Sequence, residues 1–167
     1  MDRCDGCGFE YDLAGAPGAG NAIIHGVHDL AQILRTARDA VPRRESQTWS
    51  PLEYGCHVRD VLLVQRERVL AGRRMDCPSF DPMGREERAE HDGYAEQKPP
   101  RVANQLTEAA FMFANALARL GPDDWERTVM YNYPSVSERS LRWLAVHTEH
   151  EVVHHLLDVR RQVGPVQ

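Results

Sequence analysis

Apolar residues recur every three or four positions in two stretches of the chain. In residues 21–40 they are Ile23, Val27, Leu30, Leu34 and Ala37. In residues 101–120 they are Val102, Leu106, Ala110, Phe113, Leu117 and Leu120. This spacing places the apolar side chains on one face of an α-helix. Both stretches are therefore predicted to be amphipathic helices that pack through their apolar faces.

Two further helices are predicted from their ends and their length. The stretch Ser50-Pro51-Leu52-Glu53 has a capping serine, a proline at the first helical position and a glutamate at the third, and we expect the helix to run to Ala71, where Gly72 ends it. A fourth helix is predicted over residues 137–162. The polar segments 73–100 and 122–136 are predicted to be connections, and a long loop such as 73–100 is often functional. With four helices and no clear strand pattern, the sequence predicts an all-α fold, a four-helix bundle.

The first twenty residues differ from the rest. They contain Cys4-x-x-Cys7 and then a stretch rich in glycine and alanine, residues 14–20. We therefore predict an N-terminal arm, residues 1–20, joined to a bundle domain, residues 21–167. The cysteine pair is half of a zinc-ribbon pattern, and the chain has no second pair of this kind. Three interpretations stay open: a second zinc site completed by residues from elsewhere, a redox pair, or an incidental pair. Cys56 is expected to be a small packed residue.

Composition narrows the class of protein. The chain has 167 residues, the size of one domain, and a formal charge of −5, which argues against nucleic acid as the main partner. No apolar stretch is long enough to span a membrane, and the N-terminus lacks an apolar signal core, so a cytoplasmic protein is expected. Cysteines in such a protein are expected to be thiols or metal ligands. The basic residues are nearly all arginine, as a GC-rich genome would produce.

Four of the eight histidines fall within residues 147–155. His150 and His154 are four residues apart, which on a helix brings their Cβ atoms to roughly 6 Å, so the pair can hold one divalent metal ion. The pairs His147–Glu151 and Glu151–His155 have the same spacing. A helical wheel permits the first pair to face a bundle cavity but does not choose among the three. A polar, partly solvated face that binds no metal is the alternative.

Two protein ligands are too few for a zinc-like ion, so a third ligand must come from another helix. His57 is the best candidate, because it lies about two turns into the well-capped second helix. The sequence thus predicts one divalent ion bound by His57, His150 and His154, with the remaining position open as in catalytic sites. The competing assignment uses Glu151 with His147 or His155.

These motifs resemble the DinB/YfiT-like superfamily. The similarity rests on Trp49-Ser-Pro-Leu-Glu-Tyr-Gly-Cys-His57 followed much later by His150-Glu-Val-Val-His154-His155. The resemblance covers residues 21–162 and implies a four-helix bundle that binds zinc, with nickel as the alternative, through a histidine of the second helix and a pair on the fourth. The family includes mycothiol-dependent maleylpyruvate isomerase and thiol S-transferases. The isomerase branch has the pattern Glu-Val-x-Val-His-His, with glutamate as the first residue of the pair, where this chain has His150.

A metal on three neutral histidines keeps its charge and can deprotonate a bound thiol or water. The resemblance therefore implies a mycothiol-type S-transferase or isomerase, with mycothiol as co-substrate and an electrophile as the second small-molecule partner. The arginine-rich composition fits actinobacteria, where mycothiol is the major thiol. A metal-dependent hydrolase and a non-catalytic small-molecule-binding bundle are the alternatives. Glu151 and Asp158 are candidates to orient a ligand imidazole. Monomer and homodimer both stay open.

Overall fold

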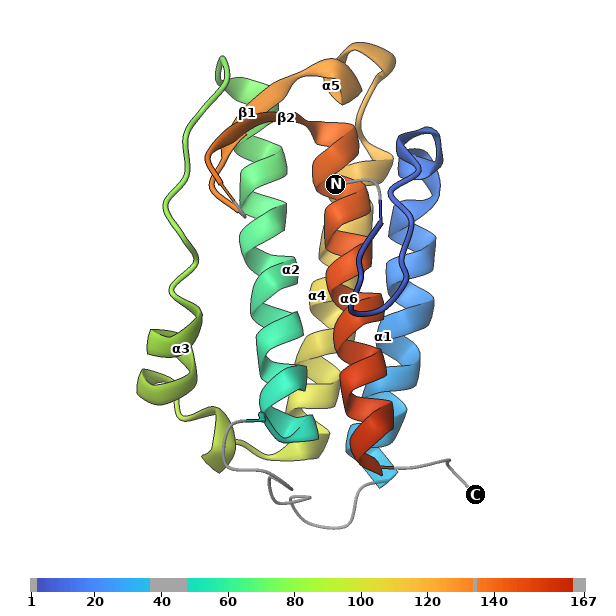
Figure 1. The fold of residues 1–167 in the computed structure, drawn as a ribbon, viewed down its shortest axis with the longest axis vertical. Coiled ribbons are helices and arrows are strands. Elements are labelled where there is room, and N and C mark those ends of the chain that lie inside the picture. Colours follow the sequence, from blue (N-terminus) through green and yellow to red (C-terminus); the bar gives the residue numbers. More distant parts are fainter. Residues whose placement is uncertain (1–2, 37–47, 134, 164–167) are drawn as a thin grey trace.

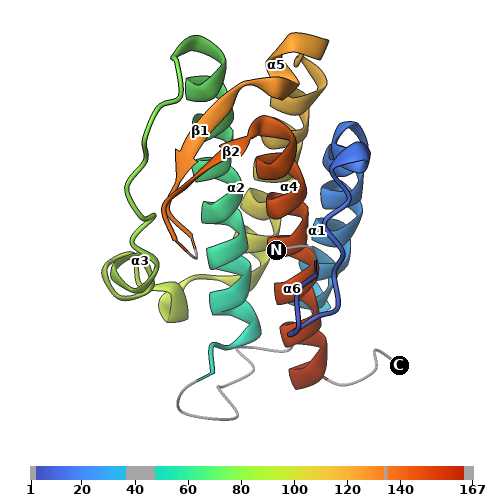
Figure 2. The ribbon, with the colours of Figure 1, turned by 45° about the horizontal axis from the view of Figure 1, so that its top comes forward.

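The computed structural model describes residues 3–36, 48–133 and 135–163, and four long helices dominate it. They are α1 (Ala19–Thr36), α2 (Pro51–Arg74), α4 (Pro99–Ala118) and α6 (Leu141–Val163). Helices α1 and α2 each pack along both α4 and α6 (Figures 1 and 2). The predicted four-helix bundle is confirmed. Within the part of the chain that is described, no helix combines the length and the apolar character needed to cross a bilayer.

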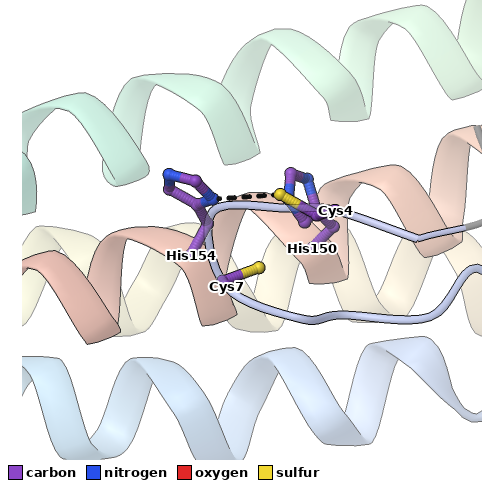
Figure 3. Close-up of side chains that lie close together, drawn as sticks. All are labelled: Cys4, Cys7, His150 and His154. Atoms are coloured by element: carbon purple, nitrogen blue, oxygen red, sulfur yellow. Dashed lines mark hydrogen bonds between the residues drawn. The ribbon is translucent and has the colours of Figure 1, made fainter.

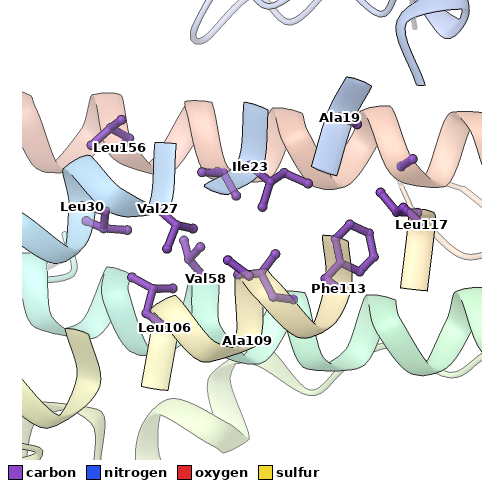
Figure 4. Packing of buried hydrophobic residues seen from close by; sticks show 14 of the residues in the cluster. Ala19, Ile23, Val27, Leu30, Val58, Leu106, Ala109, Phe113, Leu117 and Leu156 are labelled. Atoms are coloured by element: carbon purple, nitrogen blue, oxygen red, sulfur yellow. The ribbon is translucent and has the colours of Figure 1, made fainter. Parts of the chain in front are cut away.

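The core lies where the predicted apolar faces meet. Ile23 and Leu30 of α1 and Leu106 and Phe113 of α4 are all fully buried and belong to one continuous cluster (Figure 4). Burying a side chain of this kind contributes about 1.5–3 kcal/mol. The apolar residues that recur every three or four positions in the sequence are thus the residues of the core. Their packing holds in place the helices that carry the histidines.

The short elements lie in the connections. They are two 3-10 helices (Leu13–Gly18 and Tyr94–Glu96), the helices α3 (Arg85–His91) and α5 (Pro122–Glu126), and the strands β1 (Thr128–Tyr131) and β2 (Ser137–Ser140). The two strands pair antiparallel, with Thr128 opposite Ser140 and Tyr131 opposite Ser137. The prediction of helix from residue 137 is wrong for these four residues, because they pair with β1 and α6 begins at Leu141.

Helix α2 begins as predicted but ends later. The Ser50 hydroxyl accepts a hydrogen bond from the Glu53 backbone N–H (3.3 Å), and the Glu53 carboxylate accepts one from the Ser50 backbone N–H (2.8 Å). The helix then continues through Gly72 to Arg74. A Cβ atom on Gly72 would lie 2.9 Å from the Leu141 side chain. The glycine therefore permits close packing of α2 on α6, and does not end the helix.

The N-terminal arm lies along the outer side of α6 (Figures 1 and 2). An isolated β-bridge joins Arg3 and Glu10, so residues 3–10 fold back on themselves. Phe9 and Tyr11 pack against the core cluster, and Ala16 is fully buried. Helix α6 is therefore covered by the bundle on one side and by the arm on the other.

Candidate metal centre

A cavity of about 520 Å³ lies between α2, α6, β1 and the arm. Helix α2 contributes His57 and Arg68 to its wall. Helix α6 contributes Glu151 and all four histidines of the cluster, and the arm contributes Cys4 and Tyr11. Side chains that can bind a metal ion or a substrate thus line one cavity, although they lie far apart in the sequence.

Three of these side chains form a compact group of oxygen and nitrogen ligands. Ligand atoms of His57, Glu151 and His155 all lie within 4.8 Å of one another. Nε2 of His155 is 3.6 Å from Oε2 of Glu151, and the ring centroids of His57 and His155 are 4.9 Å apart. His57 is 3% exposed, and its Nδ1 has no hydrogen-bond partner among the described residues. Buried polar atoms normally have a partner, and a bound cation would account for this nitrogen.

Asp158 fixes the orientation of the His155 ring. Its Oδ2 lies 3.2 Å from Nδ1 of His155. A carboxylate in this position favours the tautomer with the proton on Nδ1, which leaves Nε2, on the Glu151 side, as the free lone pair. The expectation that Asp158 orients an imidazole thus agrees with its contact.

Two of the three side chains, His57 and Glu151, are held in the form that binds a metal ion, whereas, against the effect of burial, Asp158 and Glu151 raise the pKa of His155. Burial, together with neighbouring His155, lowers the pKa of His57 to about 3, so this ring is neutral. Burial would raise the pKa of Glu151, but the close polar contacts with His150 and His155 hold it well below its usual range. Neutral imidazole and ionised carboxylate are the forms that bind metals.

A second group of ligands lies beside the first. Cys4 and Cys7 of the arm and His150 and His154 of α6 offer ligand atoms that also lie within 4.8 Å of one another (Figure 3). Sγ of Cys4 is 3.6 Å from Nδ1 of His154. Burial would raise the pKa of the Cys4 thiol, but contacts with the Cys7 backbone, His150 and His154 lower it to about 6, whereas burial raises the pKa of the Cys7 thiol. The Cys4 thiolate, which is the form that binds metals, is therefore favoured at neutral pH.

The structure divides the three predicted metal ligands between these groups. His150 and His154 lie with the cysteines, whereas His57 lies with Glu151 and His155. The set His57, His150 and His154 is not among the ligand groups of the described residues, and it stays a prediction. Glu151 and His155 also have the right spacing in the sequence. Spacing alone, however, does not show whether this pair or the pair His150 and His154 faces His57.

Arg68 is a residue of the cavity that sequence reasoning missed. Its guanidinium is 6% exposed, lies over the ring of Tyr131 at 5.0 Å, and donates to the carbonyl of Asp81 at 2.8 Å. No ion pair of Arg68 with a carboxylate is present in the described part of the chain. Arg59 of the same helix, by contrast, is paired with Asp60 at 2.7 Å. A buried guanidinium that lacks a carboxylate is a candidate to bind an anion.

Comparison with known proteins agrees with this architecture. The family model described as "DinB superfamily" matches residues 26–159. One solved structure, described as "YfiT from Bacillus subtilis is a probable metal-dependent hydrolase with an unusual four-helix bundle topology", superposes with a TM-score of 0.65 at 15% identity, over 88% of this chain and 89% of that one. No curated protein matches the sequence significantly. Because the family model spans most of the chain, the protein belongs to the DinB superfamily.

Proposed function

We propose that the protein is a metal-dependent enzyme that activates a low-molecular-weight thiol of the mycothiol type, with the metal held by His57, Glu151 and His155. The observation that carries the proposal is the convergence of these three side chains at one cavity, with a buried nitrogen of His57 left without a partner. Two imidazoles and one carboxylate form a ligand set of catalytic zinc sites, which keep one position open. Zinc fits this set, and nickel is the alternative.

The glutamate is a ligand type that the thiol-dependent isomerase branch of the family also uses. In the isomerase branch of the family, glutamate is the first residue of the metal-binding pair on the last helix. Glu151 and His155 have the same four-residue spacing one position further along the helix, where His150 stands at the position of the family's glutamate, and both lie beside His57. A divalent metal bound there supplies Lewis acidity, which lowers the pKa of a thiol or water.

The chain's own residues orient the reactants. Asp158 holds the His155 ring through Nδ1, and Trp49 packs edge-on against the His57 ring with centroids 5.1 Å apart. Arg68, which lines the same cavity, is placed to bind an anionic group of the substrate. We therefore propose an electrophilic substrate that carries a carboxylate or a similar anion.

A hydrolase is the second candidate, and one observation favours it. The structurally similar YfiT is described as a probable metal-dependent hydrolase. The same ligands and the same open position would serve a bound water as well as a bound thiol. The two functions therefore differ in the nucleophile and share the site.

The test combines activity with metal content. Metal-loaded protein is expected to conjugate mycothiol to a bromobimane probe faster than the uncatalysed reaction. His57→Ala and His155→Ala should each lose this activity and one bound metal ion, whereas His25→Ala, an exposed change on α1, should keep both. Acceleration with water alone would support the hydrolase. Full activity and full metal content in His155→Ala would instead favour the set His57, His150 and His154.

A further inference from the structure

We propose that Cys4, Cys7, His150 and His154 form a second, structural zinc site that ties the N-terminal arm to α6. Figure 3 shows the two cysteines on the turn of the arm and the two histidines on the helix directly beside it. The site shares no ligand with the group His57, Glu151 and His155. Its ligands are therefore distinct from those of the catalytic metal proposed above.

One ligand-to-ligand distance matches tetrahedral zinc, and the others are at most 4.8 Å. Zinc binds thiolate sulfur at about 2.3 Å and imidazole nitrogen at about 2.0–2.1 Å, so two such ligands on one tetrahedral ion lie about 3.6 Å apart. Sγ of Cys4 and Nδ1 of His154 are 3.6 Å apart. The sequence spacing also matches, because Cys4-x-x-Cys7 and His150-x-x-x-His154 are the two halves of a Cys₂His₂ zinc site. The missing second half of the cysteine pattern is thus a histidine pair on the last helix.

The backbone of the arm is folded as a compact turn around the cysteines. The Gly8 N–H donates to the Cys4 carbonyl at 2.7 Å, and the Cys4 N–H donates to the Phe9 carbonyl at 2.9 Å. Gly8 has a φ of +77°, which favours glycine. A Cβ atom on Gly6 would lie 2.9 Å from Cε1 of His154. The glycines therefore let the turn approach the helix closely enough for its sulfurs to reach the histidines.

An independent observation at His150 also indicates a ligand. This side chain is 6% exposed, and although its Nδ1 lies 3.5 Å from Oε1 of Glu151, neither ring nitrogen makes a hydrogen bond of good geometry with the described residues. Phe9 and Tyr11 pack against its ring, with centroids 5.5 Å and 5.4 Å away. Leaving such a polar ring unsatisfied in an aromatic environment is costly. A zinc ion on one of its nitrogens would remove part of that cost.

A metal ion with four protein ligands has a structural role. A site with two cysteines and two histidines is closed, with no position for a substrate. Its consequence lies in the arm, because Cys4 and Tyr11 form part of the cavity wall next to the proposed catalytic ligands. The second zinc would therefore hold that wall in place and complete the cavity without taking part in the reaction.

Cobalt substitution tests the site without any mutation. Full-length protein, purified under reducing conditions and loaded with Co²⁺, is expected to show thiolate-to-cobalt charge-transfer absorption in the near ultraviolet, because only the second site contains sulfur. The double variant Cys4→Ser/Cys7→Ser should lose this absorption and one of two bound metal ions per chain. Cys77→Ser, a cysteine outside the group, should keep both.

The same measurement separates this proposal from that for the catalytic metal. His57→Ala should lose the other metal ion and keep the charge-transfer absorption. If wild-type protein lacks the absorption at full cobalt loading, or if the double variant keeps its full metal content, the second site does not exist. A Cys4–Cys7 disulfide in reduced, metal-supplied protein would also overturn it in favour of a redox pair.

Discussion

At the scale of single residues, Asp158 acts on the site through the histidine rings that it contacts. Oδ2 of Asp158 lies 3.2 Å from Nδ1 of His155 and 3.6 Å from Nε2 of His154. One carboxylate therefore contacts one ring from each ligand group. Partners of this kind orient a ligand imidazole and raise its basicity, and losing them typically weakens metal binding 10–100-fold.

Replacing Asp158 by asparagine should show this effect. Asparagine keeps the shape but removes the charge, so the His155 ring is held less firmly. In the background Cys4→Ser/Cys7→Ser, which isolates the proposed catalytic site, Asp158→Asn is expected to weaken zinc binding about 10–100-fold, measured by competition with a chromophoric chelator. Asp29→Asn, a change to an exposed carboxylate paired with Arg160, should leave the affinity unchanged. Equal zinc affinities in the two variants would show that Asp158 does not position the His155 ring.

At the scale of elements, the start of α2 positions His57. Ser50 and Glu53 satisfy each other's backbone groups, and His57 follows one to two turns later. Ser50→Ala removes the hydroxyl that accepts from the Glu53 N–H. We expect the free energy of unfolding to fall by about 1 kcal/mol, seen as a lower urea midpoint with an unchanged m-value. Ser135→Ala, at an exposed serine in the connection of β1 and β2, should change it by less than about 0.5 kcal/mol.

The helices could be predicted from the sequence because their patterns are local. Periodic apolar residues and the capping box of Ser50 and Glu53 are each contained within a few turns. Strand β2 could not be predicted, since its residues Ser-Glu-Arg-Ser have no apolar alternation and depend on pairing with β1. Helix α3 likewise buries no residue and has no apolar face to reveal it.

The metal ligands could be predicted only by type and spacing. The pairs His150–His154 and Glu151–His155 differ by one residue, or about 100° around the helix. A helical wheel separates such faces only when one side of the helix is solvated. Between residues 147 and 158 of α6 only Val153 is exposed, because the arm covers much of the side that the bundle leaves free. The arm's position is a long-range contact, so no local pattern contains it.

At the scale of the whole molecule, the second zinc would join the chain's two ends. Cys7 and His150 are separated by roughly 140 residues, and closing a loop of that length removes about 5 kcal/mol of chain entropy from the unfolded state. In a domain of this size, 1 kcal/mol corresponds to about 2–4 °C in Tm. Removing zinc with a strong chelator is therefore expected to lower Tm by roughly 10–20 °C, as measured by circular dichroism.

Two variants test whether the fall in Tm comes from losing the zinc cross-link. His57→Ala, which lacks the proposed catalytic ion, should still show a large fall in Tm on chelation, because its cross-link is intact until the chelator acts. Cys4→Ser/Cys7→Ser should begin at a lower Tm and fall only slightly further. Chelation should also expose Phe9 and Tyr11, which pack against the core, to chymotrypsin. A chelator-treated wild type that kept both its Tm and its resistance to cleavage would mean that hydrophobic packing alone holds the arm on α6.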